Sequence, residues 1–433
     1  MPCRGRGRRW LRCSVAPEWQ SDGERERDPG APQPRLRLRP FPATRFDPSV
    51  VGDIGEVTSP PYDVMDRAMI DDLLNEHPRN IVRLILPQMV SDPVRSGDPY
   101  SRAARLLTRW RANGVLRTDR EAALYVYEYG DDTRRVCGVV GALDLRKRTA
   151  SVVLPHEGVI PRVVAERLAM MASARANLEP ILLVYNGDGS TEPVLGRARQ
   201  RQPLIDVRAG DQTFHRVWSI TDRTELAALR RALEPHQALI ADGHHRYATY
   251  LQLRKRHRSI GDGKGPWDRG LALLIDHAEY PLQLGPIHRS ISELSLADLV
   301  APPGFELSPA QRFSGLPAPP DEQGCFVVTD GSAVRRLRLT DVRESAVSDA
   351  ELLHARVLPG WGGGEDQVGY HHTVDQTLRA AHQDGGVAVL LHPTSVAEVM
   401  EVARAGKMMP RKSTSFGPKP RMGLLMRCLD DEA

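Results

Sequence analysis

The chain has 433 residues, of which 41% are hydrophobic and 26% are charged, and its formal net charge is +4. These proportions are ordinary for a globular protein, and no apolar run approaches the roughly 20 residues that a membrane-spanning helix needs. The composition therefore predicts a soluble protein without a membrane partner, and the length corresponds to two or three domains or to one large one.

Positive charge is concentrated at the N-terminus. Residues 1–40 contain ten arginines and five acidic residues, so the rest of the chain is close to neutral. Residues 1–35 lack the apolar core of a signal peptide and are too rich in acids for a transit peptide. We expect a disordered basic tail there, or a start codon assigned too early. Because the remaining chain is neutral, a nucleic-acid partner is not expected.

Hydrophobic periodicity and turn residues predict the elements of the first half of the chain. In chain order these are an edge strand over 36–43, a turn-rich segment over 58–65, a helix over 67–76 capped by Asp66, a strand over 80–88, a helix over 101–116, paired strands over 123–130 and 136–145, a helix over 162–176, and strands over 179–187 and 214–220. The three-residue spacing of Asp222 and Glu225 predicts a capping box for a helix that ends near Leu233.

The second half continues the interleaving of strands and helices. Its predicted elements are a strand over 238–242 followed by a helix over 246–257, a core strand over 271–278, a Pro- and Gly-rich linker over 301–324, a hairpin over 327–339 with an Asp-Gly turn, helices over 348–357, 374–383 and 395–404, and a strand over 387–393. Alternation of this kind predicts an α/β or α+β fold with a mixed sheet.

Composition also suggests how the chain is divided into domains. After the tail (1–35), we expect a main α/β domain over 36–295, a Pro- and Gly-rich linker with a hairpin over 296–345, and a C-terminal α/β segment over 346–433 that packs on the main domain. The five cysteines are scattered and form no C-x-x-C pair, which predicts a reducing, cytoplasmic setting and no structural zinc site. The oligomeric state stays open.

The stretch ALIADGHHRYATYLQL carries five chemically distinctive residues where a predicted strand meets a predicted helix. They are Asp242, Gly243, His244, His245 and Arg246. A glycine permits positive φ, and a helix start offers free N–H groups and the positive end of the helix dipole. The histidines and the arginine add donors, and an arginine can bind two phosphate oxygens at once. This pattern predicts a phosphate site, with Asp242 as a candidate catalytic acid.

Two other interpretations of this junction stay open. Asp242 and the two histidines could bind a metal ion, although adjacent residues of a strand point to opposite faces. The junction could also be purely structural, as a turn between a strand and a helix.

Two further acids are candidates for catalysis. Asp63 follows two prolines in PPYDV, which restrict the backbone that carries it. Glu157 follows a strand in PHEG, and it is a candidate catalytic group and a candidate magnesium ligand. Arg167, on the next predicted helix, is either a phosphate contact or a salt-bridge partner. For each acid the alternative is a helix cap or a solvated side chain.

The C-terminal run AGKMMPRKSTSFGPKPRMGL has the prolines and glycines of a shaped loop. The chain has only six lysines, and three of them fall in this run. Nearly all other basic residues of the chain are arginines, so the lysines in this run suggest that a primary amine is needed here. A lysine amine is a compact charge that can reach a phosphate. Lys412 is a candidate catalytic residue, and Ser413 and Lys419 are candidate cofactor-binding residues. The pairs His288–Arg289 and His371–His372 rank below them.

Four of these motifs together resemble the bacterial and archaeal family called domain of unknown function 1015. They are TSPPYDVM, the His-Glu pair at 156–157, DGHHRYAT and MPRKSTSFGPKPRMGL, and the resemblance extends from about Leu36 to Leu429. Members of that family tend to carry His-Glu-His-Thr where this chain has PHEGVIP. Gly158 and Val159 replace polar positions there, which weakens a catalytic role beyond His156 and Glu157.

The DGHHR junction alone is also similar to the phosphate-contacting motif of the ParB and sulfiredoxin-like superfamily. That resemblance implies a nucleotide-binding core, with ATP or ADP and magnesium as cofactors and a small phosphorylated molecule as partner. It also implies a small-molecule phosphotransferase, by analogy with kinases that phosphorylate free serine. The alternatives are a metal-dependent phosphohydrolase and a non-enzymatic, ParB-like nucleotide sensor associated with DNA.

Overall fold

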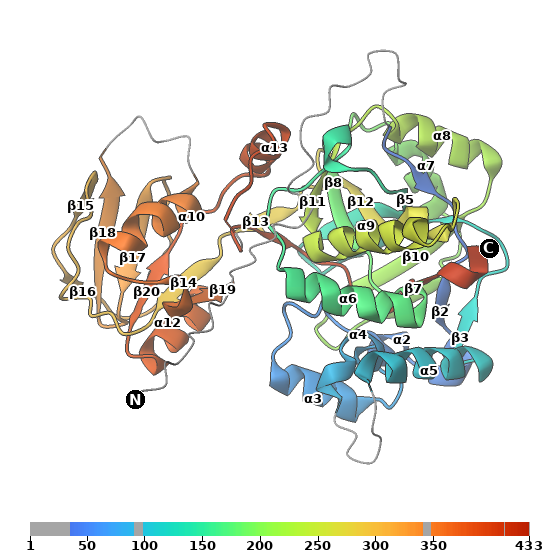
Figure 1. Cartoon of the computed structure of the whole chain (residues 1–433), viewed down its shortest axis with the longest axis horizontal. Coiled ribbons are helices and arrows are strands. Elements are labelled where there is room, and N and C mark those ends of the chain that lie inside the picture. The colour runs from blue at the N-terminus through green and yellow to red at the C-terminus, as the bar shows by residue number, and fades with distance from the viewer. Residues whose placement is uncertain (1–34, 91–97, 341–347, 411, 433) are drawn as a thin grey trace, which may run out of the picture.

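The computed structural model describes residues 35–90, 98–340, 348–410 and 412–432. The tail expected over residues 1–34 lies outside these described residues. Figure 1 shows two bodies, each built around one β-sheet, and the C-terminus lies in the same body as the blue N-terminal elements. We call residues 288–390 the smaller body and the other described elements the larger body.

The larger body is organised by one mixed sheet, which has nine strands within the described residues. In the order β6-β11-β8-β12-β5-β4-β10-β9, with β1 also paired to β5, the strands are β6 (Val153–Leu154), β11 (Ala238–Asp242), β8 (Ile181–Tyr185), β12 (Arg269–Asp276), β5 (Arg135–Asp144), β4 (Leu124–Gly130), β10 (Phe214–Ile220), β9 (Ile205–Arg208) and β1 (Leu38–Arg39). The pairs β6–β11 and β8–β12 are parallel, and the other pairs are antiparallel. The chain therefore has an α+β fold with a mixed sheet.

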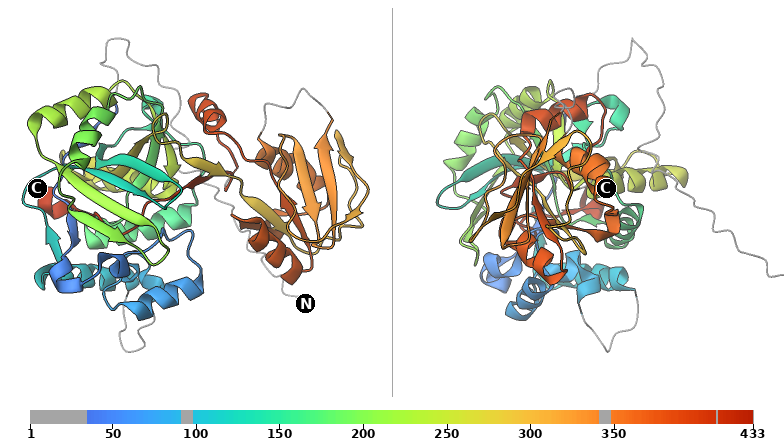
Figure 2. Two further views of the ribbon diagram at one scale, coloured as in Figure 1. Left: turned by 180° about the vertical axis from the view of Figure 1, so that it is seen from behind. Right: turned by 90° about the vertical axis from the view of Figure 1, so that its left-hand side faces the viewer.

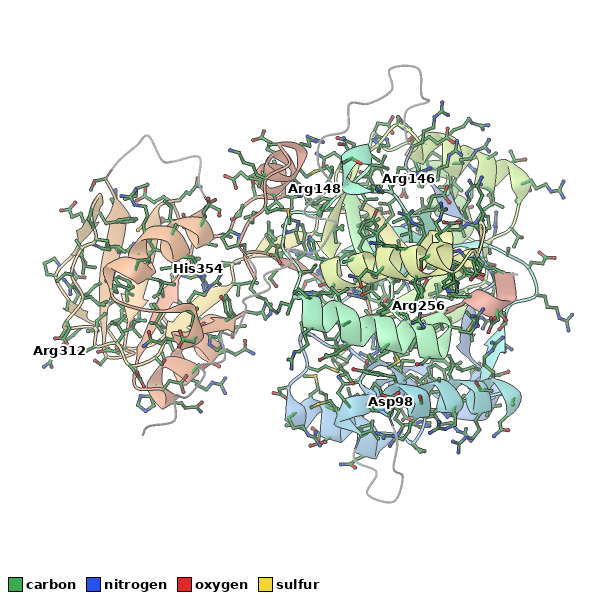
Figure 3. All side chains as sticks on the ribbon, in the orientation of Figure 1. Asp98, Arg146, Arg148, Arg256, Arg312 and His354 are labelled. Carbon is green, nitrogen blue, oxygen red and sulfur yellow. The ribbon has the colours of Figure 1, made fainter. Side chains whose placement is uncertain are left out.

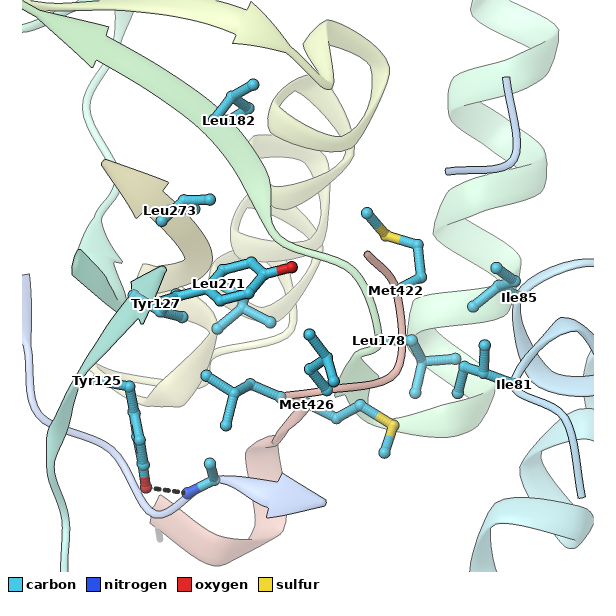
Figure 4. Close-up of a cluster of buried hydrophobic side chains, with 14 of the residues drawn as sticks. Ile81, Ile85, Tyr125, Tyr127, Leu178, Leu182, Leu271, Leu273, Met422 and Met426 are labelled. Carbon is cyan, nitrogen blue, oxygen red and sulfur yellow. Dashed lines mark hydrogen bonds between the residues drawn. The ribbon is translucent and has the colours of Figure 1, made fainter. Parts of the chain in front are cut away.

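Both faces of this sheet are buried, because successive side chains of a strand point to opposite faces. In β4, Tyr125 and Tyr127 join one core cluster, whereas Leu124 and Val126 join the other. The second cluster is completed by α7 (Glu192–Arg199), α8 (Arg223–Leu233) and α9 (His244–Ser259). The first contains the residues that Figure 4 labels, namely Ile81, Ile85, Tyr125, Tyr127, Leu178, Leu182, Leu271, Leu273, Met422 and Met426.

Short N-terminal helices and the C-terminal chain cover the first face. The helices are α1 (Pro48–Val51), α2 (Ile54–Val57), α3 (Arg67–Glu76), α4 (Val82–Ile85) and α5 (Pro99–Ala112). Figure 1 shows α6 (Pro161–Ala174) lying between α5 and α9. Two small ribbons complete this body: β2 (Thr44–Phe46) with β3 (Leu116–Thr118), and β7 (Ala176–Asn177) with β22 (Arg427–Cys428).

The smaller body contains a second sheet, which has seven strands within the described residues. In the order β15-β18-β17-β20-β14-β19, with β16 paired to β18, these are β15 (Phe305–Leu307), β18 (Ala333–Leu339), β17 (Cys325–Thr329), β20 (Val387–Leu390), β14 (His288–Ile291), β19 (Val368–His371) and β16 (Gln311–Arg312). Its helices are α10 (Asp349–Leu352), the π-helical turn Leu353–Val357, α11 (Leu358–Gly360) and α12 (Val374–Gln383).

The segments that precede and follow the smaller body in the sequence run between the two bodies. β13 (Gln283–Gly285) leads into β14 and pairs with β21 (Ser415–Gly417), which Figure 2 shows from behind. α13 (Val396–Arg404) follows β20 and packs on the first core cluster of the larger body through Val396, Val399 and Met400. The residues around β21 therefore lie where the two bodies meet.

Most predicted elements are present with shifts of a few residues at their ends. β10 and α12 have the predicted bounds, and Asp66 caps α3 by accepting from the Met69 N–H at 2.9 Å. Asp222 caps α8 as expected, but the Glu225 carboxylate contacts Arg201 at 2.7 Å instead of returning to the cap. The hairpin over 327–339 is confirmed as β17 and β18.

One element prediction is wrong. The run NIVRLILPQ was expected to be a strand over 80–88, but it forms α4 and a short 3₁₀ turn. Its apolar side chains are buried on every side of the backbone, so the pattern has no period that separates helix from strand. The Asn80 side chain supports the helical turn, since its Oδ1 accepts from the Val82 N–H at 3.0 Å.

The Pro- and Gly-rich stretch 301–324 contains β15 and β16, which pair with β18. The boundary expected at residue 345 falls inside the second sheet, because β17 and β20 pair across it. In the described part of the chain, no helix is long and apolar enough to cross a membrane.

Candidate functional site

The junction between β11 and α9 has the predicted strand–turn–helix form. β11 ends at Asp242, Gly243 adopts φ +95°, and α9 begins at His244. A Cβ atom at Gly243 would lie 2.9 Å from Ile181 Cγ2 and 3.1 Å from Arg246 Nε. Both the positive φ and this close packing require glycine at the turn.

A Gly243→Ala substitution should therefore destabilise the protein by about 1–3 kcal/mol, because it adds a contact to a backbone conformation that L-residues rarely adopt. Urea denaturation measures this loss. Gly261→Ala is a matched control, since Gly261 follows α9 with φ +89° and its added Cβ would meet no described atom within 4 Å. Equal losses in the two variants would show that packing at Gly243 contributes nothing beyond the backbone conformation.

A cluster of four charged side chains lies directly behind this turn. Arg246 donates to Asp242 Oδ2, and Lys419 Nζ lies 3.1 Å from Asp242 Oδ1. Lys419 also donates to Asp63 Oδ2. The cluster thus joins two acids and two bases from three distant parts of the chain, and its formal charges cancel.

The cluster is largely buried, with Arg246 2%, Lys419 12% and the two carboxylates 18% exposed at their side chains. Burial by itself would raise the pKa of Asp242, but Lys419 and Arg246 outweigh it and hold that pKa below its usual value. Burial likewise opposes the charge of Lys419, yet Asp242 and Asp63 raise its pKa. Asp242 and Lys419 are therefore both charged at neutral pH.

Tyr62 and Arg167 lie beside this cluster. The Arg167 guanidinium stacks 4.0 Å from the centre of the Tyr62 ring, and that of Arg246 lies 6.0 Å from it. Arg167 also donates to the Ile85 carbonyl at 3.2 Å and to Glu179 at 3.4 Å. Of the two roles left open for Arg167, the structure shows the salt bridge. Arg246 likewise directs one Nη group to the Pro180 carbonyl and the other to Asp242.

His244 and His245 are held as neutral rings with defined tautomers. His244 Nε2 accepts from the His156 N–H at 3.3 Å, and His245 Nε2 accepts from the Ile160 N–H at 3.0 Å. Burial lowers the pKa of His244 to about 3. Burial, followed by the charges of Arg167 and Lys412, lowers that of His245 to about 4. Since a backbone N–H only donates, each ring carries its proton on Nδ1 and presents a donor there.

Glu157 anchors the C-terminal loop. Its Oε1 accepts from the Ser413 N–H at 3.0 Å, the Thr414 N–H at 3.1 Å and the Thr414 hydroxyl at 3.0 Å. The Thr414 hydroxyl also lies 2.8 Å from Nε2 of the fully buried His156. The Ser413 hydroxyl donates to the Pro410 carbonyl at 2.6 Å, so it is engaged within its own loop.

Lys412 is an exposed base of this loop. It has φ +58°, which is uncommon for a residue with a side chain. The positive charge of Lys412 helps to lower the pKa of two histidines. One is His245 of α9, and the other is His372, which follows β19 of the smaller body. His372 Nδ1 in turn lies 2.9 Å from the Ser415 hydroxyl.

The structure thus brings the predicted site residues into two linked groups at the start of α9. The first holds Asp63, Asp242, Gly243, Arg246 and Lys419, and the second holds Glu157, His244, His245, Lys412 and Ser413. Within the described residues, no group of three or more His, Cys, Asp or Glu side chains is arranged to hold a metal ion.

Sequence reasoning ranked Arg289 low and did not select Thr414 as a site residue. Arg289 donates to the Lys412 carbonyl at 2.9 Å across a separation of 123 residues. Thr414 connects His156 and Glu157. The resemblance covered the Thr414 motif, whereas nothing in the sequence around Arg289 signals this pairing.

A family model described as "Protein of unknown function (DUF1015)" matches residues 38–351. The chain belongs to this family. The match includes Asp63, Glu157 and the whole DGHHR junction of this DUF1015 protein, and it ends before Lys412. Among curated proteins, none matches the chain.

Several solved structures are similar to this DUF1015 protein at low identity. A free serine kinase in complex with AMP has 13% identity and a TM-score of 0.33, with 65% of this chain and 87% of that one covered. SbnI from Staphylococcus aureus, truncated at its C-terminus, has 11% identity and a TM-score of 0.36, with coverage of 67% and 87%. A conserved hypothetical protein from Pyrococcus furiosus has 13% identity and a TM-score of 0.33, with coverage of 68% and 97%. The similarity of the junction to the ParB and sulfiredoxin-like superfamily stays a prediction.

Proposed function

We propose that this protein binds the phosphates of a nucleotide at the start of α9 and transfers a phosphoryl group to a small molecule. The observation that carries the proposal is the meeting of two features at one turn. An uncapped helix start with two neutral histidine donors lies next to the buried carboxylates Asp63 and Asp242. Phosphoryl transfer requires mainly positioning and the neutralisation of charge, which these groups supply.

The phosphate side of the proposed site consists of donors. No described side chain caps α9, whereas α3, α8 and α12 are each capped by their own Asp or Thr. The first N–H groups of α9, like those of α4, α6 and α7, therefore have no side-chain cap, and the helix dipole favours an anion there. His244 and His245 add Nδ1–H donors, and the exposed Lys412 adds a compact positive charge. Arg246 contributes positive charge from behind the turn.

The acceptor side consists of carboxylates. Asp63 Oδ2 accepts a hydrogen bond from Lys419 Nζ, while the buried Oδ1 of Asp63 has no hydrogen-bond partner among the described residues. A buried carboxylate oxygen without a partner is costly, and a substrate hydroxyl would satisfy it. In the proposed reaction the acceptor oxygen forms a bond to the terminal phosphorus and the bridging P–O bond of the nucleotide breaks. The hydroxyl proton passes to Asp63 or Asp242.

Magnesium fits this site as an ion that enters with the nucleotide. Mg²⁺ is commonly bound by one or two carboxylates together with phosphates and waters, so it needs no dedicated cluster of protein ligands. The second carboxylate oxygen of Glu157 is the protein oxygen suited to it, since Glu157 Oε1 already accepts three hydrogen bonds. When bound, the ion neutralises charge on the phosphates.

Thermal shift of the full chain with ATP, ADP, CTP and phosphoserine, each with and without Mg²⁺, tests the proposal. A ligand at about 100 times its Kd stabilises a protein by about 2.7 kcal/mol, which corresponds to a shift of a few degrees. We expect such a shift with ATP or ADP and Mg²⁺. Lys412→Ala should weaken this binding about tenfold, because it removes one charge-assisted contact.

Lys407→Ala is the matched control, because Lys407 is also exposed and lies just after α13. Free serine is the first acceptor to supply, since the resemblance of the junction implies it, and phosphoserine formation is measured by mass spectrometry. The absence of stabilisation by all four ligands would contradict the proposal. A shift that Lys412→Ala leaves unchanged would contradict the assigned position of the phosphates.

A further inference from the structure

One peptide group of the C-terminal loop is held at both of its polar atoms. The Lys412 carbonyl accepts from Arg289 Nη2 at 2.9 Å, and the N–H of the next residue, Ser413, donates to Glu157 Oε1 at 3.0 Å. Arg289 belongs to β14 of the smaller body, whereas Glu157 lies between β6 and α6 of the larger body. The two bodies therefore fix the plane of this peptide group together.

The backbone conformation of Lys412 depends on such support. Its φ of +58° lies in the left-handed region, where a residue with a Cβ atom is disfavoured. Conformations of this kind persist when surrounding contacts over-determine them. Because the peptide plane that follows Lys412 is fixed, the backbone orientation from which its side chain extends is fixed as well.

Arg289 is itself held rigidly within the smaller body. It is fully buried, its Nε lies 3.2 Å from His354 Nε2, and one Nη group donates to the Ile287 carbonyl. Its guanidinium lies 4.4 Å from the centre of the Tyr370 ring, and the His354 ring stacks on Tyr370 at 6.1 Å. Figure 3 labels His354 inside the smaller body. From this rigid position, Arg289 also holds the loop that carries Lys412, through the Lys412 carbonyl.

A second contact joins the same loop to the smaller body. His372 Nδ1 lies 2.9 Å from the Ser415 hydroxyl, and Ser415 is paired with Gly285 in the ribbon of β13 and β21. The loop from Lys412 to Ser415 is therefore attached to the smaller body at both ends. A change in the position of that body would displace the loop relative to α9.

We infer that Arg289 is a positioning residue, which holds the Lys412–Ser413 peptide so that Lys412 reaches the ligand at the start of α9. The smaller body thereby sets the ligand affinity of a site that lies mainly in the larger body. This last step rests on the proposed function, whereas the hold on the peptide group does not. By linkage, a ligand that binds Lys412 also favours the docked position of the smaller body.

Cleavage by trypsin after Lys412 tests the hold directly, because the bond that is cut is the one held at both atoms. Arg289→Lys keeps the charge but lacks the fork that reaches His354, the Ile287 carbonyl and the Lys412 carbonyl together. We expect cleavage at Lys412–Ser413 to become about tenfold faster, as one charge-assisted hydrogen bond is lost. Mass spectrometry of the peptide that begins at Ser413 measures the rate.

Arg335→Lys is the matched control, since Arg335 also forms a fork in the smaller body but donates to the carbonyls of Leu296, Leu299 and Ser308 within it. It should leave cleavage after Lys412 at the wild-type rate. Glu157→Ala releases the same peptide from the other side and should accelerate cleavage without a change in the smaller body. Wild-type cleavage rates in both Arg289→Lys and Glu157→Ala would overturn the inference.

Calorimetry with ATP or ADP tests the consequence for binding. Arg289→Lys should weaken nucleotide binding about tenfold and should have no further effect in a Lys412→Ala background, as a double-mutant cycle requires when one residue acts through the other. Equal losses in both backgrounds would overturn the role assigned to Arg289. If the wild-type protein binds no nucleotide while Arg289→Lys still accelerates cleavage, the proposed function fails and the hold on the peptide stands.

Discussion

Replacement of Lys419 by methionine should destabilise this protein by about 3–5 kcal/mol at neutral pH, because it removes the cation between two buried carboxylates. Lys419 pairs with Asp63 and Asp242, and all three side chains are less than one fifth exposed. Methionine fills a similar volume, so the lost energy reflects charge more than packing. Urea denaturation at pH 7.5 measures the change.

The loss should become smaller at low pH. Without Lys419 the two carboxylates repel each other, so protonation of one of them at acid pH relieves the variant but not the wild-type protein. Asp63→Asn combined with Lys419→Met should cost less than the sum of the single substitutions, since one uncompensated charge is gone. Lys407→Met is the exposed control. A loss below about 1 kcal/mol at pH 7.5 would mean that the pair behaves as a surface salt bridge.

Acid should destabilise this protein through its buried neutral histidines. Burial lowers the pKa of His156, His215 and His244 to about 3 each. In the unfolded chain a histidine has a pKa of about 6.5, so the unfolded state takes up protons first as the pH falls. The resulting stabilisation is complete above about pH 6.5 and is lost as the pH falls toward 3. Each such histidine should cost up to about 1.4 kcal/mol per pH unit in that range.

Denaturation midpoints between pH 7.5 and pH 4.5 measure this dependence. The slope of the free energy of unfolding against pH reports how many more protons the unfolded state binds. His156→Gln should reduce this number by up to one, because glutamine still donates to the Thr414 hydroxyl but does not titrate. The groups around His156 are His244, which meets it edge to face at 4.6 Å, and Glu157, at 3.9 Å. His382→Gln makes the same substitution at an exposed histidine and is the control. An unchanged slope in His156→Gln would show that His156 is hydrated in the folded state.

Local chemistry made much of the fold predictable. Asp66 and Asp222 were recognised as helix caps, and both accept N–H groups of the first helical turn. The Asp-Gly turn of the hairpin holds Gly331 at φ +93°. Such interactions involve residues that are close in the sequence, so the local sequence is enough to predict them. The run at 80–88 was wrongly predicted because its burial is set by the surrounding elements.

The candidate site was predicted in part for a similar reason. Gly243 was placed at a turn between a strand and a helix, and its φ and contacts require glycine. The sequence also selected Lys419 and Asp63, but it assigned them separate tasks. Their ion pair connects residues 356 positions apart, and no local pattern encodes a contact over that separation. The sequence likewise suggested that Arg246 contacts a phosphate, but it did not reveal that Arg246 donates to the Pro180 carbonyl and to Asp242.

By itself, the sequence determined most of the elements, a fold that mixes helices with a mixed sheet, and the residue types available for phosphate chemistry, because periodicity, caps and turns act over short distances. Only the tertiary structure decided which charges neutralise one another and which tautomers His244 and His245 adopt. It also placed the Lys412–Ser413 peptide between Glu157 and Arg289. These outcomes depend on burial and on contacts between distant segments, which come into being only when the two sheets and their helices pack.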